Sequence, residues 1–185
     1  MLPRVSISKT GSFGVAWWHV AWLLVSAIVC TYDALFVLLR PRTLPGGDLN
    51  WIFSIYDLYI QVDKNYGVFD GLGSGFLHSV AYLNLVEVGL SVIALLMLSV
   101  RRSRAMGALL TLAINVAILW KTALFFSFEI LNNFHSTEHN DRMTWWLLYV
   151  VPNGIWLLMP LLTSLSLMRR MAPALSTDRS AKKHD

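Results

Sequence analysis

Four long runs of apolar residues dominate the hydrophobic pattern of this 185-residue chain. They cover residues 15–39, 76–100, 106–128 and 144–168, and the polar residues are concentrated between them. Each run exceeds the roughly 20 residues that an α-helix needs to cross the hydrocarbon core of a bilayer. The pattern therefore predicts an all-α, polytopic membrane protein built as a bundle of four transmembrane helices.

The composition supports this class. Hydrophobic residues make up 56% of the chain and charged residues 14%, with a mean hydropathy of +0.55, which is too apolar for an ordinary soluble domain. We expect one membrane domain over residues 15–170, a short N-terminal segment over residues 1–14 and a polar, disordered tail over residues 171–185. The single cysteine, Cys30, excludes an intrachain disulfide and a thiolate metal cluster.

The net charge of +4 comes from short basic clusters at the ends of the apolar runs. We interpret these clusters as topology signals rather than as a nucleic-acid surface. Arg4 and Lys9 precede the first run, three arginines lie in residues 101–104, and two more are residues 169–170. The positive-inside rule then predicts that both termini and the loop between the second and third runs face the cytoplasm.

The remaining segments between runs, residues 40–75 and 129–143, are then expected to face the lumen. Within the first, we expect a short interfacial helix or lid over residues 51–66. Near the C-terminus, Lys182 and Lys183 resemble the dilysine retrieval signal of endoplasmic-reticulum membrane proteins; the alternative is a chance pair in a solvated tail. Because that signal requires a cytoplasmic tail, we predict a multi-pass protein of the endoplasmic-reticulum membrane.

Ionisable side chains interrupt the apolar runs. Glu87 lies in the middle of the second run and shares a helix face with Asn84, and Asp33 lies in the first run. A carboxylate at membrane depth costs on the order of several kcal/mol unless it is neutralised or paired, so such residues are candidates for function. Lys121 in the third run is a partner for either acid, or extends to the interface. We therefore expect a polar cavity inside the bundle.

Every run carries further polar residues on one face. For Ser26, Asn115 and Thr122 we expect hydrogen bonds that join helices, worth about 0.6 kcal/mol each. In the fourth run, Asn153 and Trp156 are three residues apart and face one way. For Trp156, packing and the stabilisation of a cation both remain open.

Other chemistries lack a signature in the chain. His135, Glu138 and His139 form a His-x-x-Glu-His pattern without a third clustered ligand, which is a weak zinc signal. There is no phosphate-binding loop, no Gly-x-Ser-x-Gly and no catalytic triad motif. We predict no metal and no cofactor.

Four short segments, in this order, resemble the EXPERA superfamily, which includes the sterol Δ8-Δ7 isomerase (emopamil-binding protein) and the sigma-2 receptor. They are residues 32–41 (YDALFVLLRP), 59–66 (YIQVDKNY), 84–87 (NLVE) and 152–156 (PNGIW), the last followed by Pro160. The resemblance covers about residues 15–170 and is strongest to a fungal branch of that family. It implies a four-helix bundle in the endoplasmic reticulum, with a cavity that opens toward the membrane for sterol-like or cationic amphiphilic ligands.

The resemblance also implies site residues. Asp33, Glu87, Asn153 and Trp156 fall at positions that line the cavity of the isomerase. Asp33, Asp63 and Glu87 match acids that are important in the sigma-2 receptor. Dimerisation is common in the family, so the expected partners are a sterol or terpenoid ligand, the lipid bilayer and a second copy of the chain, with no nucleic acid.

Shifting a double bond requires a proton donor, stabilisation of the resulting carbocation and a dry site. We expect Glu87 to donate the proton, Asp33 to be the partner acid, Asn153 to orient Glu87 or a substrate oxygen, and Trp156 to form a cation-stabilising wall. The expected substrate-binding residues are Trp22, Tyr32, Tyr56, Asp63, Tyr66, His78, Tyr82, Asn84 and Lys121. The same groups suit isomerisation of a sterol double bond or cyclisation of a terpenoid alkene or epoxide, and these alternatives stay open.

Two positions depart from the isomerase pattern. Val29 stands where the isomerase has a histidine that helps to handle the proton, and Leu90 stands where it has a threonine. Together with the retained Asp63, the missing histidine favours the alternative of a non-catalytic protein that binds sterols or cationic amphiphiles, as the sigma-2 receptor does. The pair Asn153 and Trp156 favours the enzyme.

Overall fold

The computed structural model describes residues 14–67 and 72–181, and within these ranges it is helical with no strands. Four long helices form the body: α1 (Trp17–Leu38), α5 (Leu72–Ser99), α6 (Arg104–Leu131) and α8 (Val151–Ala181). The shorter elements are α2 (Asn50–Phe53), α3 (Tyr56–Val62), α4 (Lys64–Gly67), α7 (Arg142–Thr144) and the π-helical turn η1 (Trp145–Val150).

The prediction of four apolar spans is confirmed. The helical stretches long and apolar enough to cross a membrane are Trp17–Leu38, Ser74–Ser99, Arg104–Leu131 and Arg142–Pro173. Large apolar side chains on their outer faces are exposed, as on a surface that contacts lipid; Ile28, Leu96 and Trp120 are 70%, 63% and 72% exposed. The chain is therefore a four-helix membrane bundle.

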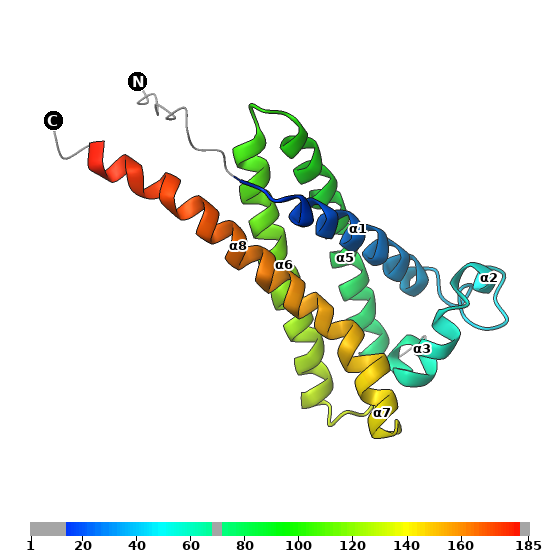
Figure 1. The fold of residues 1–185 in the computed structure, drawn as a ribbon. Coiled ribbons are helices and arrows are strands. Elements are labelled where there is room, and N and C mark those ends of the chain that lie inside the picture. Colours follow the sequence, from blue (N-terminus) through cyan, green and yellow to red (C-terminus); the bar gives the residue numbers. More distant parts are fainter. Residues whose placement is uncertain (1–13, 68–71, 182–185) are drawn as a thin grey trace.

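The helices pack in chain order, α1 against α5, α5 against α6 and α6 against α8 (Figure 1). At the turn between α5 and α6, the backbones approach closely at Gly107. A Cβ atom there would lie 2.9 Å from the Leu98 backbone nitrogen, so only glycine fits without a shift of the backbone. The beginning of α1, this turn and the end of α8 lie toward one end of the bundle, whereas α2, α3 and α7 lie toward the other (Figure 1).

Two apolar clusters form the core. One gathers Leu23, Ala94, Ile118 and Leu167 between the long helices, and the other lies nearer the short helices and includes Phe36. Between α1 and α6, the Trp22 indole donates to Asn115 Oδ1 at 3.0 Å. The prediction that Asn115 joins helices is therefore confirmed.

The other two residues expected to join helices do something else. Ser26 Oγ contacts Cys30 Sγ at 3.8 Å within the same helix, α1. Thr122 faces a cavity described below. Both lie on inward faces, but neither makes an interhelical hydrogen bond among the described contacts.

Where the sequence predicts a short interfacial helix or lid over residues 51–66, the structure has three short helices, α2, α3 and α4, within segment 40–67. Its fold depends on Arg40, which is 4% exposed. The guanidinium donates to the carbonyl oxygens of Val37 (3.1 Å), Asn65 (2.9 Å) and Tyr66 (3.0 Å) and to Ser74 Oγ (3.4 Å). These bonds hold α4 against the end of α1 and the start of α5. We call α3 and α4, residues 56–67, the roof.

The expectation of a disordered tail from residue 171 is wrong as far as Ala181, because α8 continues to that residue. Met171, 4% exposed, lies one turn beyond Leu167 in the same buried cluster, so the packed face of α8 extends past the predicted boundary. Arg4, Lys9, Lys182 and Lys183 lie outside the described residues, and so do most of the predicted N-terminal segment and the end of the tail.

Candidate functional site

A cavity of about 630 Å³ lies between α1, the roof, α5, α6 and α8. Apolar and aromatic side chains form most of its wall. Asp33 is the only carboxyl, and Lys121 the only cation, among the described residues that line it. The expected site residues that line it are Tyr32, Asp33, Tyr56, Tyr66, Asn84, Lys121, Asn153 and Trp156.

Asp33 receives hydrogen bonds from three different elements. The Tyr56 hydroxyl in α3 donates to its Oδ1 at 2.8 Å, and the Tyr66 hydroxyl in α4 donates to the same atom at 3.1 Å. Asn84 Nδ2 in α5 donates to Oδ2 at 3.0 Å. All three bonds strengthen as negative charge develops on the Asp33 carboxyl group.

Stacked aromatic rings place the two tyrosine donors. The ring of Tyr56 stacks on Phe36 with centroids 4.0 Å apart, and on Tyr66 at 5.8 Å. Tyr59 meets Tyr66 edge to face at 4.8 Å. Because the roof contributes the three tyrosine rings as one group packed on Phe36 of α1, the position of the roof sets the hydrogen bonds to Asp33.

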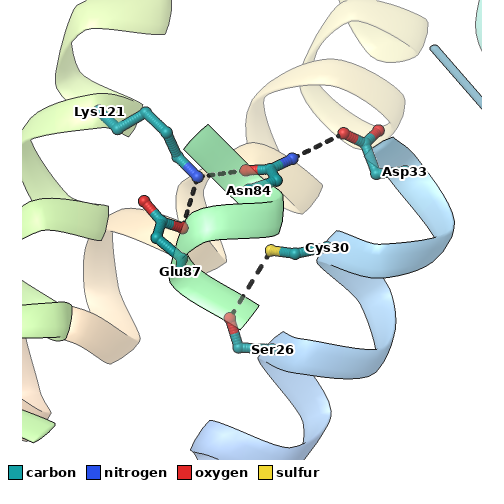
Figure 2. A network of polar contacts seen from close by, with 6 residues as sticks. All are labelled: Ser26, Cys30, Asp33, Asn84, Glu87 and Lys121. Carbon is teal, nitrogen blue, oxygen red and sulfur yellow. Dashed lines mark hydrogen bonds and ion pairs between the residues drawn. The ribbon is translucent and has the colours of Figure 1, made fainter. Parts of the chain in front are cut away.

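A polar chain leads from Asp33 to the second acid (Figure 2). Asn84 donates to Asp33 through its nitrogen and accepts a hydrogen bond from Lys121 Nζ through its oxygen. Lys121 Nζ also forms an ion pair with Glu87 Oε2 at 2.6 Å, and both side chains are only 9% exposed. Lys121 therefore pairs with Glu87 directly and reaches Asp33 only through Asn84.

Across the cavity, α8 presents Asn153 and Trp156. Asn153 Nδ2 donates to the Tyr59 hydroxyl at 3.0 Å and to the Tyr149 carbonyl oxygen at 2.8 Å. Trp156 meets Trp22 edge to face, with centroids 5.6 Å apart. Asn153 thus holds a roof tyrosine, and the two tryptophans bridge α1 and α8 below the cavity.

The structure separates five of the expected site residues from the cavity wall. Glu87 lies behind Lys121, and Trp22 lies behind Trp156. Asp63 is buried where the roof meets the loop that follows α6. The remaining two, His78 and Tyr82, are on α5.

Tyr82, which we expect to bind substrate, is 62% exposed and lies outside the cavity wall. Residues two apart on an α-helix differ by roughly 200° in direction, so a helix that turns Asn84 inward turns Tyr82 outward. His78 does not reach the cavity either, since its Nδ1 contacts the Ser74 carbonyl oxygen at 2.6 Å near the start of α5.

At the two positions that depart from the isomerase pattern, Val29 lines the cavity and is 40% exposed, whereas Leu90 is 36% exposed and lies outside the wall. Sequence reasoning missed Tyr59 and Cys30, both of which line the cavity. The spacing of Tyr59 three residues after Tyr56 is a signal that would have found it.

Metal ligands do not gather in the part of the chain that the structure describes: no three His, Cys, Asp or Glu residues come together there. The His-x-x-Glu-His pattern is at the surface, where His135 Nδ1 lies 4.0 Å from Glu138 Oε1 with both side chains largely exposed. His139 Nε2 instead donates to the Gln61 carbonyl oxygen at 2.6 Å.

Comparison with known proteins adds no assignment to this geometry. Neither a protein-family model nor a curated protein matches the chain. The resemblance to the EXPERA superfamily therefore stays a prediction that rests on the four short segments.

Proposed function

We propose that this chain is a membrane-embedded isomerase or cyclase that protonates a sterol or terpenoid alkene (or epoxide), with Asp33 rather than Glu87 as the acid. The observation that carries the proposal is the position of Asp33 as the one carboxyl in the described wall of an aromatic cavity. Glu87 is less suited to the role, because it pairs with Lys121 and does not line the cavity.

The proposed step moves one proton. The carboxyl of protonated Asp33 transfers its proton to an alkene carbon, which forms a C–H bond, leaves a carbocation on the neighbouring carbon and leaves Asp33 as a carboxylate. In an isomerisation, the carboxylate then removes a proton from the carbon on the other side of the cation, which forms the shifted double bond and restores the acid. In a cyclisation, a second alkene attacks the cation before the proton is lost.

The hydrogen bonds to Asp33 support this step. Tyr56, Tyr66 and Asn84 all donate to the carboxyl oxygens, and such bonds strengthen as negative charge develops there. They therefore stabilise the product of proton transfer more than the starting acid. An apolar surround also keeps water from capturing the carbocation.

Other groups have supporting roles in this proposal. The faces of Trp156 and of the roof tyrosines stabilise a cation without being attacked by it. Asn153 acts as a positioning residue through Tyr59. Lys121, held by Glu87, positions Asn84 and so the third donor to Asp33.

A specific observation also favours a second candidate, a non-catalytic binder of cationic amphiphiles. Three donors form hydrogen bonds to the carboxyl oxygens of Asp33, and such bonds stabilise the carboxylate. A carboxylate in an aromatic cavity is a site for an ammonium group. The same wall that stabilises a transient carbocation suits a permanent cation. Turnover separates the two functions.

The proposed setting is the endoplasmic-reticulum membrane, with both termini in the cytoplasm. Supporting this, the start of α1, the arginine-containing turn between α5 and α6 and the end of α8 lie toward the same end of the bundle (Figure 1). The roof would then face the lumen.

The test of the proposed function is a product assay in deuterated water. Purified protein is incubated with a sterol and terpenoid extract, and the lipids are analysed by mass spectrometry. We expect a shifted or cyclised product that carries deuterium on carbon and is absent when protein is omitted. Unchanged lipids, together with a cationic amphiphile that binds and is displaced competitively, would contradict catalysis and support the binder.

A further inference from the structure

The roof is attached to the loop that follows α6 by a row of hydrogen bonds to its backbone. The Asn140 side chain donates to the Val62 carbonyl oxygen at 2.8 Å, and His139 donates to that of Gln61 at 2.6 Å. The Lys64 backbone nitrogen donates to the Ser136 carbonyl oxygen at 3.2 Å. Asp63 lies in the middle of this row.

Two carboxyl groups are buried at this junction. Asp63 is 1% exposed, and Glu129, near the end of α6, is 2% exposed. Both oxygens of Glu129 accept hydrogen bonds, one from the Thr137 hydroxyl at 2.7 Å and the other from the Ser136 hydroxyl. Glu129 is therefore fully satisfied as a carboxylate.

Asp63 is only half satisfied. Its Oδ1 accepts from the Asn65 backbone nitrogen at 3.0 Å, but its buried Oδ2 has no hydrogen-bond partner among the described residues. A buried carboxylate oxygen without a partner is costly, and a proton on that oxygen removes the charge. The geometry therefore places the proton of this pair on Asp63.

No cation offsets the two acids among the described ion pairs. The titratable groups that face Asp63 are Glu129 from α6 and three tyrosines, Tyr59 from α3, Tyr66 from α4 and Tyr149 from η1. The basic side chains in the hydrogen-bonded row, Lys64 and His139, are exposed. The pKa of Asp63 is raised to about 7, mainly by burial and also by the charge of Glu129, while hydrogen bonding from Asn65 and from the nearby Ser136 hydroxyl opposes the rise.

We propose that Asp63 and Glu129 form a proton-dependent latch, which holds the roof against the loop after α6 while Asp63 is protonated and loosens it when Asp63 ionises. Loosening follows because two buried carboxylates then face each other without a cation. Since Tyr59, Val62 and Tyr66 of the roof line the cavity, the latch controls access to the cavity from this end. The inference concerns docking of the roof and stands whether or not the cavity catalyses a reaction.

The direction of the pH effect follows from proton linkage. Docking raises the pKa of Asp63, so the docked roof binds the proton more tightly than the undocked roof does. Docking is then strongest at low pH, weakens as the pH rises from the ordinary carboxyl range to about 7, and is constant above that. Each unit of pKa difference changes the docking equilibrium about tenfold.

Hydrogen exchange of residues 56–67 tests the latch in the full chain in lipid nanodiscs. After correction for intrinsic exchange rates, we expect the wild-type roof to exchange at least about tenfold faster at pH 8 than at pH 5. This factor follows from the proton linkage between docking and Asp63. D63N mimics the protonated acid and should stay protected at both pH values. E138Q removes an exposed acid from the same loop, and H139Q removes the imidazole that contacts the roof; both should keep the wild-type transition.

E129Q provides a second test that does not depend on the folding of D63N. Removing the neighbouring charge should move the transition of the roof to lower pH. A wild-type roof that exchanges equally at both pH values, a D63N roof that keeps the wild-type dependence, or an E129Q transition at the wild-type pH would each overturn the latch.

Discussion

Replacing Lys121 with methionine is expected to lower the free energy of unfolding by about 3–5 kcal/mol, the usual cost of removing one partner of a buried ion pair. The side chains of Lys121 and Glu87 are each 9% exposed and their charged atoms are 2.6 Å apart. K121M leaves Glu87 as a buried anion without its cation, and it also removes the donor to Asn84.

The double variant K121M/E87L should recover most of this loss, because replacing both charges with apolar groups removes the unpaired anion. R42Q is the matched control, since Arg42 and Asp48 form an ion pair of the same 2.6 Å length at the exposed surface. It should leave stability unchanged, because solvent screens exposed pairs. Reversible unfolding in detergent measures all three variants. A K121M protein as stable as wild type would show that the ion pair between Lys121 and Glu87 does not contribute to the free energy of unfolding.

Replacing Asp33 with asparagine is expected to reduce turnover by about 10²–10⁴-fold, the range that a positioned general acid contributes. Asparagine keeps the shape of the side chain but has no transferable proton. E87Q should stay within about tenfold of the wild-type turnover per folded molecule, which is a rise of at most roughly 1.4 kcal/mol in the activation barrier, because Glu87 acts only through Lys121.

Both variants are compared in the deuterated-water assay, normalised to the protein that elutes as a folded species. Y82F is the matched control, because Tyr82 lies outside the cavity wall and is 62% exposed. Loss of turnover in E87Q as large as in D33N would restore Glu87 as the proton donor and contradict the assignment to Asp33. Full activity in D33N would show that Asp33 is not the proton donor.

The fold was predictable because it depends on a property that each segment carries alone. A run of apolar residues longer than the bilayer core has to form a helix, since no other backbone structure short of a closed barrel satisfies its hydrogen bonds in lipid. The cavity was predictable for a related reason, because Asp33, Asn84 and Glu87 are too polar to face lipid and so must turn toward one another.

The partners of these side chains were not predictable from spacing. The sequence allows Lys121 to pair with either acid. Only the packing of α6 against α5 gives its direct contact with Glu87. The hydrogen bonds from Tyr56 and Tyr66 to Asp33 depend on how a loop of three short helices folds back over the bundle. Tyr82 is a different case, because its spacing of two residues from the inward-facing Asn84 already indicates an outward direction.

The central claim is that the aromatic cavity beside Asp33 holds the apolar ligand, and photolabelling tests it most directly. A photoreactive sterol analogue is bound to the wild-type protein, cross-linked and mapped by mass spectrometry. We predict labels on wall residues such as Tyr59, Pro152 and Trp156, which decrease when unlabelled sterol or terpenoid competes. Labels confined to outward-facing residues such as Leu96 and Trp120, unaffected by competitor, would contradict the claim.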